Sequence, residues 1–339
     1  MADRAGEAIL QRLWSRGRAL LGVEHAIMGG AMTWVSERNL VAAISNAGGF
    51  GVLACGAMKP DQLSAEIAAT AALTGQPFGV NLITMHPELE ALIDVCGDHG
   101  VGHVVLAGGL PTVKTVSHAK ARGARVLGFA PALAFARKLV RMGADAVIIE
   151  GMEAGGHIGP VSTSVLAQEI LPVLTEAPVF VAGGIGRGDA IAAYLRMGAS
   201  GAQLGTRFVC AAESIAHPNF KQAFIRANAR DAQPSAQLDP RFPVIPVRAL
   251  VNQGTRRFAD KQREVIDRHD AGELDQKAAQ LEIEHFWAGA LRRAVIEGDV
   301  ESGSVMAGQS VGMVTAVQPT AEIIAEMVAQ AAEALGRQA

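Results

Sequence analysis

Short apolar segments rich in β-branched residues alternate along the chain with longer amphipathic segments. Each apolar segment is a continuous run, which is typical of parallel strands buried on both faces. The runs recur roughly every 21 to 33 residues, about the length of one strand–helix unit. This pattern predicts eight strands, at residues 25–28, 51–54, 78–82, 102–107, 124–129, 145–150, 178–182 and 201–205.

The segments between these runs have helical periodicity, and most end at glycine, which commonly closes a helix. Examples are SERNLVAAISNAGG, PELEALIDVCGDHG and PALAFARKLVRMG. Eight strand–helix units predict an α/β fold, a (β/α)8 TIM barrel. A doubly wound sheet would more often have about five to seven strands and one early glycine fingerprint.

The chain is longer than a barrel alone requires, because it has 339 residues and such a barrel takes about 250. The surplus follows the eighth strand. We therefore predict a barrel formed by residues 1–212 and 288–339, and a small helical domain formed by residues 213–287. Active sites of this fold lie at the C-terminal ends of the strands, so we expect the helical domain to cover the substrate there. The last amphipathic segment, 319–336, is expected to rejoin the outer helices.

Composition and charge exclude several classes of protein. Half of the residues are hydrophobic, 19% are charged and the formal net charge is −3, so neither nucleic acid nor an anionic membrane is an expected partner. No apolar run is long enough to span a membrane, and the first residues do not resemble a signal peptide. The three cysteines and nine histidines show no metal-binding spacing. We expect a cytoplasmic protein without a metal site.

Glycine-rich segments follow several of the predicted strands. AGGIG follows the seventh strand and LGTRF the eighth, where TIM barrels commonly bind phosphate through backbone N–H groups. Gly183, Gly184 and Gly205 would let the backbone approach a phosphate, and Thr206 would add a hydroxyl. The alternative is that both segments are ordinary tight turns. These residues alone predict a phosphorylated ligand or cofactor.

The segment EAGGHIG after the sixth strand contains the candidate catalytic residue, His157. Its imidazole lies among glycines at a strand end, where it could serve in acid–base catalysis or hydrogen-bond an anionic substrate. The alternative is a hydrogen-bonded structural histidine. Asn81 ends the third strand, where its amide could bind a ligand ring or cap the following loop.

Five segments together resemble a known family. They are IMGGAMTWVSERNLVAAISNAGGFGVL, PFGVN, DAVIIEGMEAGGHIG, VAGGIGRGDAIAAYLRMGASGAQLGTRFVCAAESIAHPNFK and GDVESGSVMAGQ. They resemble the FMN-dependent nitronate monooxygenase (2-nitropropane dioxygenase) superfamily from about residue 22 to about residue 330. GMEAGGHIG, AESIAHPNFK and GSVMAGQ are more similar to enoyl-ACP reductase II, a flavin enzyme of fatty-acid synthesis.

The resemblance implies an FMN site and a role for each matching residue. Gly30, Ala31 and Met32 would lie along the isoalloxazine ring, and His157 would be the active-site histidine. The other implied cofactor residues are Asn81, Glu150, Gly155, Gly183, Gly184, Gln203, Gly205, Thr206, Met306, Gly308 and Gln309. One departure lies on the substrate side: the reductases usually have Q-G-G-M after the first strand, where this chain has Gly29 and Ala31 in place of Gln and the second Gly.

The resemblance leads to two catalytic hypotheses. The first is reduction of an enoyl thioester, a small molecule or an acyl-carrier substrate, with NADH or NADPH as co-substrate. The second is oxidation of alkyl nitronates with O2. A non-catalytic protein that binds a phosphorylated ligand is a third alternative, and the oligomeric state is left open, with a homodimer among the alternatives.

Overall fold

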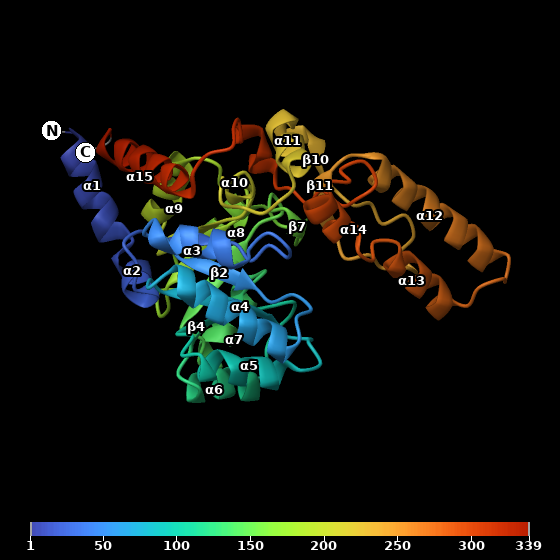
Figure 1. Cartoon of the computed structure of the whole chain (residues 1–339), viewed down its shortest axis with the longest axis horizontal. Helices are drawn as coiled ribbons and strands as arrows, with labels where there is room; N and C mark the ends of the chain where they lie inside the picture. Colours follow the sequence, from blue (N-terminus) through green and yellow to red (C-terminus); the bar gives the residue numbers. More distant parts are fainter. Residues whose placement is uncertain (1, 338–339) are drawn as a thin grey trace.

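The computed structural model describes residues 2–337, and eight parallel strands form its main sheet, in the order β1-β9-β8-β6-β5-β4-β3-β2. A bridge between Met28 and Phe50 joins the two edges, so the sheet is nearly closed into a barrel with helices around it (Figure 1). Each strand overlaps one predicted run, which confirms the (β/α)8 prediction. The strands are β1 (Ile27–Gly29), β2 (Gly51–Ala54), β3 (Phe78–Ile83), β4 (His103–Ala107), β5 (Arg125–Phe129), β6 (Ala146–Glu150), β8 (Val179–Ala182) and β9 (Gly201–Leu204).

Helices connect successive strands and bury one face against the sheet. Polar side chains begin several of them: Thr112 accepts the N–H of Thr115 at α6, and Ser162 accepts the N–H of Val165 at α8. The outer helices are α3 (Arg38–Asn46), α4 (Pro60–Leu73), α5 (Leu89–Asp98), α6 (Val113–Ala121), α7 (Leu133–Arg141), α8 (Thr163–Ile170), α9 (Gly188–Arg196) and α15 (Thr320–Gly336). The last of these, α15, packs against α9 and against α1 (Ala2–Leu13), which is followed by α2 (Ser15–Leu21).

The strands are apolar throughout because both of their faces are buried. All four residues of β2, β8 and β9 are buried, and Phe180 on β8 is fully enclosed. Cys55, Cys96 and Cys210 are buried free thiols. No helix within residues 2–337 is both long enough and apolar enough to cross a membrane.

A second, small sheet joins the segment after β6 to the segment after β9. Its strands are β10 (Ala232–Pro234), β11 (Val247–Leu250) and β7 (Gly156–His157), all antiparallel. Between β9 and β10 lie α10 (Thr206–Val209), α11 (Pro218–Arg226) and η1 (Ala229–Asp231). After the arm described next come α14 (Ala290–Arg292), a short π-helix (Arg293–Glu297) and η3 (Gln309–Met313).

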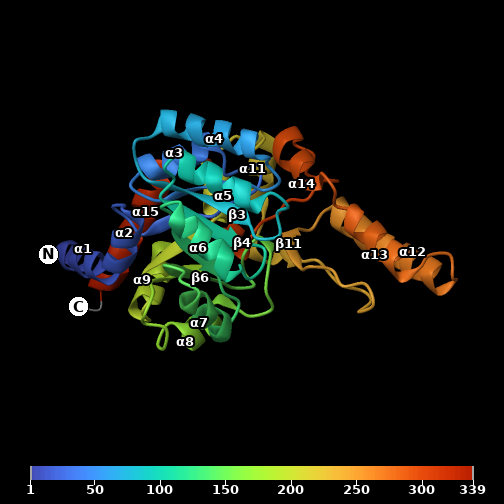
Figure 2. The same ribbon diagram turned by 90° about the horizontal axis from the view of Figure 1, so that it is seen from below.

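Two helices of the inserted segment, α12 (Gln253–Asp270) and α13 (Gln276–His285), form an arm that extends away from the barrel (Figures 1 and 2). They bury their apolar sides on each other rather than on the barrel. The arm has a separate hydrophobic cluster of Phe242, Phe258, Val265, Ala279 and Ile283, against which Phe286 and Trp287 pack. The hairpin therefore does not lie across the barrel mouth, whereas α11 and β11 stay beside the barrel. The substrate-covering role of residues 213–287 remains a prediction.

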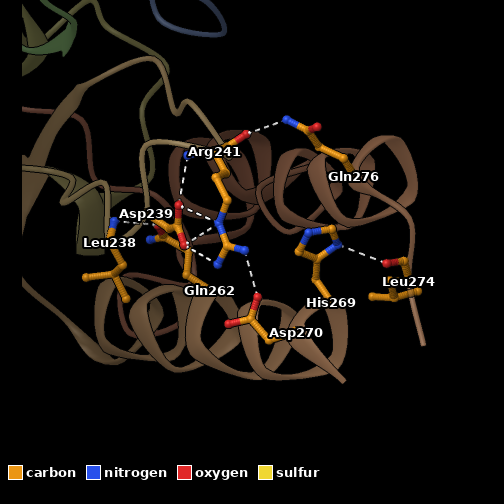
Figure 3. A network of polar contacts seen from close by, with 8 residues as sticks. All are labelled: Leu238, Asp239, Arg241, Gln262, His269, Asp270, Leu274 and Gln276. Atoms are coloured by element: carbon orange, nitrogen blue, oxygen red, sulfur yellow. Dashed lines mark hydrogen bonds and ion pairs between the residues drawn. The ribbon is translucent and has the colours of Figure 1, made fainter. Parts of the chain in front are cut away.

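Polar contacts fix the loop before β11 to this arm (Figure 3). Arg241 forms ion pairs with Asp239 at 2.6 Å and with Asp270 of α12 at 2.7 Å. The amide oxygen of Gln262 accepts the N–H of Leu238 at 3.2 Å. The loop and α12 are therefore expected to move as one unit.

Candidate functional site

The ends of the first and last barrel strands meet at glycines. The N–H of Gly30 donates to the carbonyl oxygen of Leu204 at 2.8 Å, and a Cβ on Gly30 would lie 3.5 Å from Cα of Gly205. A Cβ on Gly205 would in turn meet Sδ of Met32 at 3.4 Å. Gln203 is buried on β9, opposite Met28. The structure thus brings Gly30, Met32, Gln203 and Gly205 together, with Ala31 packed against the core beside them.

A late segment of the chain, residues 306–309, closes the other side of this group. The N–H of Gly308 donates to Oγ1 of Thr206 at 3.0 Å, and a Cβ on Gly155 would lie 2.6 Å from that same nitrogen. The N–H of Gln309 donates to the carbonyl oxygen of Glu153 at 2.9 Å. Met306 forms a bridge with Ala249, and its Sδ lies beside Gly156. Gly155, Thr206, Met306, Gly308 and Gln309 therefore form one contact group, although the sequence separates them by up to 154 positions (155 to 309).

A cavity of about 210 Å³ opens beside this group, lined by Glu153, Thr163, Gly183, Gly184, Ala190, Tyr194, Gln309, Ser310 and Met313. Gly183 and Gly184 have φ angles of 93° and 73°, which L side chains rarely adopt, so the cavity wall there is bare backbone. Such a wall fits a phosphorylated cofactor. The carboxylate of Glu153 is already engaged, because its Oε2 accepts both the N–H and the hydroxyl of Thr163 at 2.9 Å.

The ring of His157 is available for chemistry. Its strand, β7, pairs with β11 opposite Val247, and the side chain is exposed. Desolvation by the surrounding protein lowers the pKa of His157 below its usual 6.5. Within the described part of the chain no charged neighbour contributes to this shift. The imidazole is therefore mostly neutral near pH 7, with one ring nitrogen as a donor and the other as an acceptor.

Glu150 and Asn81 lie at the ends of β6 and β3. Burial raises the pKa of the Glu150 carboxyl to about 7, so it is partly protonated at neutral pH and can donate a hydrogen bond. Asn81 is buried, and its side-chain NH2 donates to the carbonyl oxygen of Val105 at 3.0 Å. That bond fixes the amide at the strand end. The position is compatible both with binding a ligand ring and with capping the following loop.

Two other histidines have structural partners. The ring of His103 contacts the carbonyl oxygen of Leu20 at 2.8 Å, and His118 lies 2.8 Å from a carboxylate oxygen of Asp94. Among the side chains that the structure describes, no group of three or more His, Cys, Asp or Glu residues is placed to hold a metal ion.

Three residues near the strand ends were not found from the sequence. Ser36 donates its hydroxyl to the carbonyl oxygen of Gly30 at 2.7 Å and so fixes the loop after β1. Trp34 in that loop has a φ of 70°, and Arg292 lies over its ring at 5.8 Å. Arg248 on β11 is buried and bonds to the loop that leads to His157. A polar residue inside an apolar run, as in VRAL, is the one signal that could have indicated Arg248.

A nearly closed barrel with a bare glycine wall and an exposed imidazole at its strand ends is an arrangement typical of α/β-barrel enzymes that bind a phosphorylated cofactor. The family profile for nitronate monooxygenase matches residues 15–92 and 88–330. The chain therefore belongs to the nitronate monooxygenase family and is an oxidoreductase of this flavin-dependent family.

Relatives and solved structures agree with this assignment. The chain is 30% identical to a (3aS,4S,5R,7aS)-5-hydroxy-7a-methyl-1-oxo-octahydro-1H-indene-4-carboxyl-CoA dehydrogenase of Rhodococcus jostii, over 92% of this chain and 94% of the relative. It is 37% identical to a Mycobacterium tuberculosis protein of the same name, over 61% of this chain and 59% of that relative. FabK from Thermotoga maritima superposes with a TM-score of 0.83 at 38% identity, covering 92% of this chain and 94% of FabK.

Proposed function

We propose that this protein binds FMN non-covalently and reduces an enoyl thioester, with NADH or NADPH as the reductant. The observation that carries the proposal is the contact of residues 306–309 with both the 153–156 loop and Thr206. That contact gathers a glycine backbone wall and the His157 loop at one end of the barrel. The similarity to FabK and to two carboxyl-CoA dehydrogenases supports a thioester substrate.

The residues at the strand ends fit FMN in two groups. The backbone of Gly183, Gly184 and Gly205 with the hydroxyl of Thr206 would hold the phosphate, since backbone N–H groups suit anions. The ring and ribityl chain would contact Gly30, Ala31, Met32, Asn81, Glu150, Gly155, Gln203, Met306, Gly308 and Gln309. When bound, FMN would supply hydride transfer between the nicotinamide and the substrate.

His157 would act on the thioester. Hydride addition to the β-carbon places negative charge on the thioester carbonyl oxygen, and a ring N–H of neutral His157 would hydrogen-bond that oxygen. The α-carbon then takes up a proton from water, which completes saturation of the double bond. A histidine with a lowered pKa suits this role, because it keeps the donor without placing a full positive charge in the site.

Nitronate oxidation with O2 is the second candidate, and the match to the nitronate monooxygenase profile favours it. The same His157 N–H could hydrogen-bond the anionic oxygens of the nitronate. The two reactions differ in their co-substrates. The reductase requires NADH or NADPH and an enoyl thioester, whereas the monooxygenase consumes oxygen with alkyl nitronate alone.

An absorbance spectrum followed by anaerobic titration tests the proposal. The purified protein should be yellow, release FMN on denaturation, and bleach when NADH or NADPH is added. Crotonyl-CoA should then restore the oxidised spectrum without oxygen. A colourless protein would contradict FMN binding. Oxygen uptake with ethylnitronate, together with no bleaching by either nicotinamide, would replace the reductase with the monooxygenase.

A further inference from the structure

Arg248 is a buried arginine that bonds to backbone rather than to carboxylates. Its side chain is 2% exposed. Nε donates to the carbonyl oxygen of Met152 at 2.8 Å, and Nη1 donates to the carbonyl oxygen of Ala232 at 2.5 Å. The first acceptor lies in the loop that leads from β6 to His157, and the second lies on β10. The guanidinium therefore joins two chain segments that are far apart in the sequence.

The strand that carries Arg248 also holds the segments on either side of the candidate site. Val247 pairs with His157, and the N–H of Ile158 donates to the carbonyl oxygen of Pro246 at 3.0 Å. Ala249, the next residue, bridges to Met306 of the late segment. Residues 246–249 are thus the common support of the histidine loop and of the segment proposed to contact FMN.

The position of Arg248 separates it from the reacting groups. Side chains alternate across a strand, so Val247 and His157 share one face while Arg248 and Gly156 share the other. Arg248 would therefore act through the backbone of residues 152–157 and not by touching the substrate.

Burial of this cation requires a reason other than ion pairing. The hydrogen bonds found for its side chain end on carbonyl oxygens, and desolvation lowers the pKa of Arg248 while the charge of Glu153 raises it. Burying an arginine without a carboxylate partner costs free energy. A neutral residue of similar shape would therefore be at least as favourable if stability were the only requirement.

We infer that Arg248 is a positioning residue, which holds Met152 O and thereby fixes the loop that presents the His157 ring. This inference rests on the proposed function for the catalytic role of His157. The hydrogen bonds from Arg248 to Met152 and Ala232 do not depend on that role.

The test compares Arg248→Met and Arg248→Lys with Arg125→Met. Arg125 also donates to a backbone carbonyl oxygen, that of Leu20, but it begins β5 at the end of the barrel away from the site. Each protein is labelled with ¹⁵N-histidine and titrated by NMR, with the His157→Ala spectrum assigning the His157 signal. This measurement needs no turnover.

Release of the loop should expose the His157 ring more fully to water and reduce its remaining desolvation. Because desolvation is what lowers its pKa, the pKa of His157 should rise towards 6.5 in Arg248→Met. Turnover by the same variant should fall by about tenfold or more in kcat, with a smaller change in KM for nicotinamide. Arg248→Lys keeps the charge and one donor, so it should shift in the same direction by less. Arg125→Met should match the wild-type protein in both measurements.

An unchanged His157 pKa with wild-type kcat in Arg248→Met would overturn the inference, and so would equal effects in Arg125→Met. If Arg248→Met does not fold, Arg248→Lys decides by the same criteria. The proposed function would be refuted if the wild-type protein had neither flavin nor turnover. If the His157 pKa still changed on substitution of Arg248, the positioning role of Arg248 would stand.

Discussion

The N–H of Gly308 donates to Oγ1 of Thr206 at 3.0 Å, which joins the end of the eighth barrel strand to a residue 102 positions later. This contact places the late segment over the site. It also leaves no room for a side chain at position 308, because a Cβ there would lie 2.8 Å from the carbonyl oxygen of Glu153 and 3.0 Å from Thr206 Oγ1.

Gly308→Ala should therefore push the late segment away from the site. We expect a loss of about 1–3 kcal/mol from overpacking, seen as a lower thermal midpoint and as weaker retention of FMN on dialysis. Gly75→Ala is the control, since a Cβ at Gly75 would meet no atom within 4 Å. Equal flavin content in Gly308→Ala and wild type would mean that the late segment does not contact the cofactor.

His157→Ala should lose turnover and keep the fold. The side chain is exposed, so its removal leaves no cavity in the core. Loss of an acid–base or hydrogen-bonding group should lower the rate of substrate reduction by about 10²–10⁴-fold. Stopped-flow measurement should show nearly normal flavin bleaching by nicotinamide and slow reoxidation by crotonyl-CoA. Normal reoxidation would make His157 a structural residue. His99→Ala, on the opposite end of the barrel, serves as the control.

Glu150 should make the flavin-free protein less stable as pH rises. Its folded pKa, about 7, exceeds the ordinary value of 4.5, so its favourable contribution is full below about pH 4.5 and is lost as pH rises through 7. Glu150→Gln should therefore raise the unfolding free energy at pH 8 by about 1–2 kcal/mol and change it little at pH 5. Urea unfolding at the two pH values measures this.

Glu90→Gln gives the opposite sign and is the matched comparison. Lys114 lowers the pKa of the exposed Glu90, so ionised Glu90 is favourable above the unfolded pKa. That variant should be slightly less stable than wild type at pH 8 and equal to it at low pH. If both variants changed the unfolding free energy at pH 8 in the same direction, burial would not be the cause of the raised Glu150 pKa.

Trp34 stores backbone strain in the loop after β1. Its φ of 70° is the one positive value among the described non-glycine residues, and it persists beside the cation of Arg292. Trp34→Gly should be more stable than Trp34→Ala by about 1 kcal/mol, the reverse of the usual order, because glycine adopts this angle without strain. Thermal denaturation of the two variants compares them directly, and the usual order would show that the loop relaxes.

Much of the barrel follows from sequence because its strands are apolar on both faces. The predicted run 51–54 coincides with β2, and 146–150 lies within the predicted 145–150. The small sheet left no such signal, since β7 is only Gly156 and His157. The course of the arm, which extends away from the barrel, left no signal for a related reason. Periodicity shows that a helix has an apolar face, but it does not show which neighbour that face contacts.

The residues of the site likewise include some that the sequence indicates and others that it does not. Glycines after strands predict bare backbone, and Gly183 and Gly184 line a cavity as that pattern indicates. Arg248 could not be assigned, because its partners are carbonyl oxygens of Met152 and Ala232, which any residue could supply. Side chains that bond to backbone leave little trace in the sequence.

Phe258→Ala should loosen the arm and leave the barrel intact. Phe258 is 3% exposed and packs within 5.3 Å of the ring centres of both Phe286 and Trp287. Its truncation should cost about 3–5 kcal/mol within this cluster. Hydrogen exchange should increase in residues 253–285, while exchange in the barrel strands and the flavin absorbance stay as in wild type. Increased exchange throughout the barrel would mean that the arm and barrel unfold together.

The separate cluster of the arm has an evolutionary consequence. The base of the arm is tied by Asn252, whose side chain donates to the carbonyl oxygens of Val300 and Gly303, while the distal ends of α12 and α13 point away from the barrel (Figure 1). Substitutions, insertions or deletions beyond that base can accumulate without disturbing the packing of the barrel strands. Selection can therefore diversify the arm of such proteins independently of the barrel, and a lineage can acquire new surface properties while its barrel stays the same.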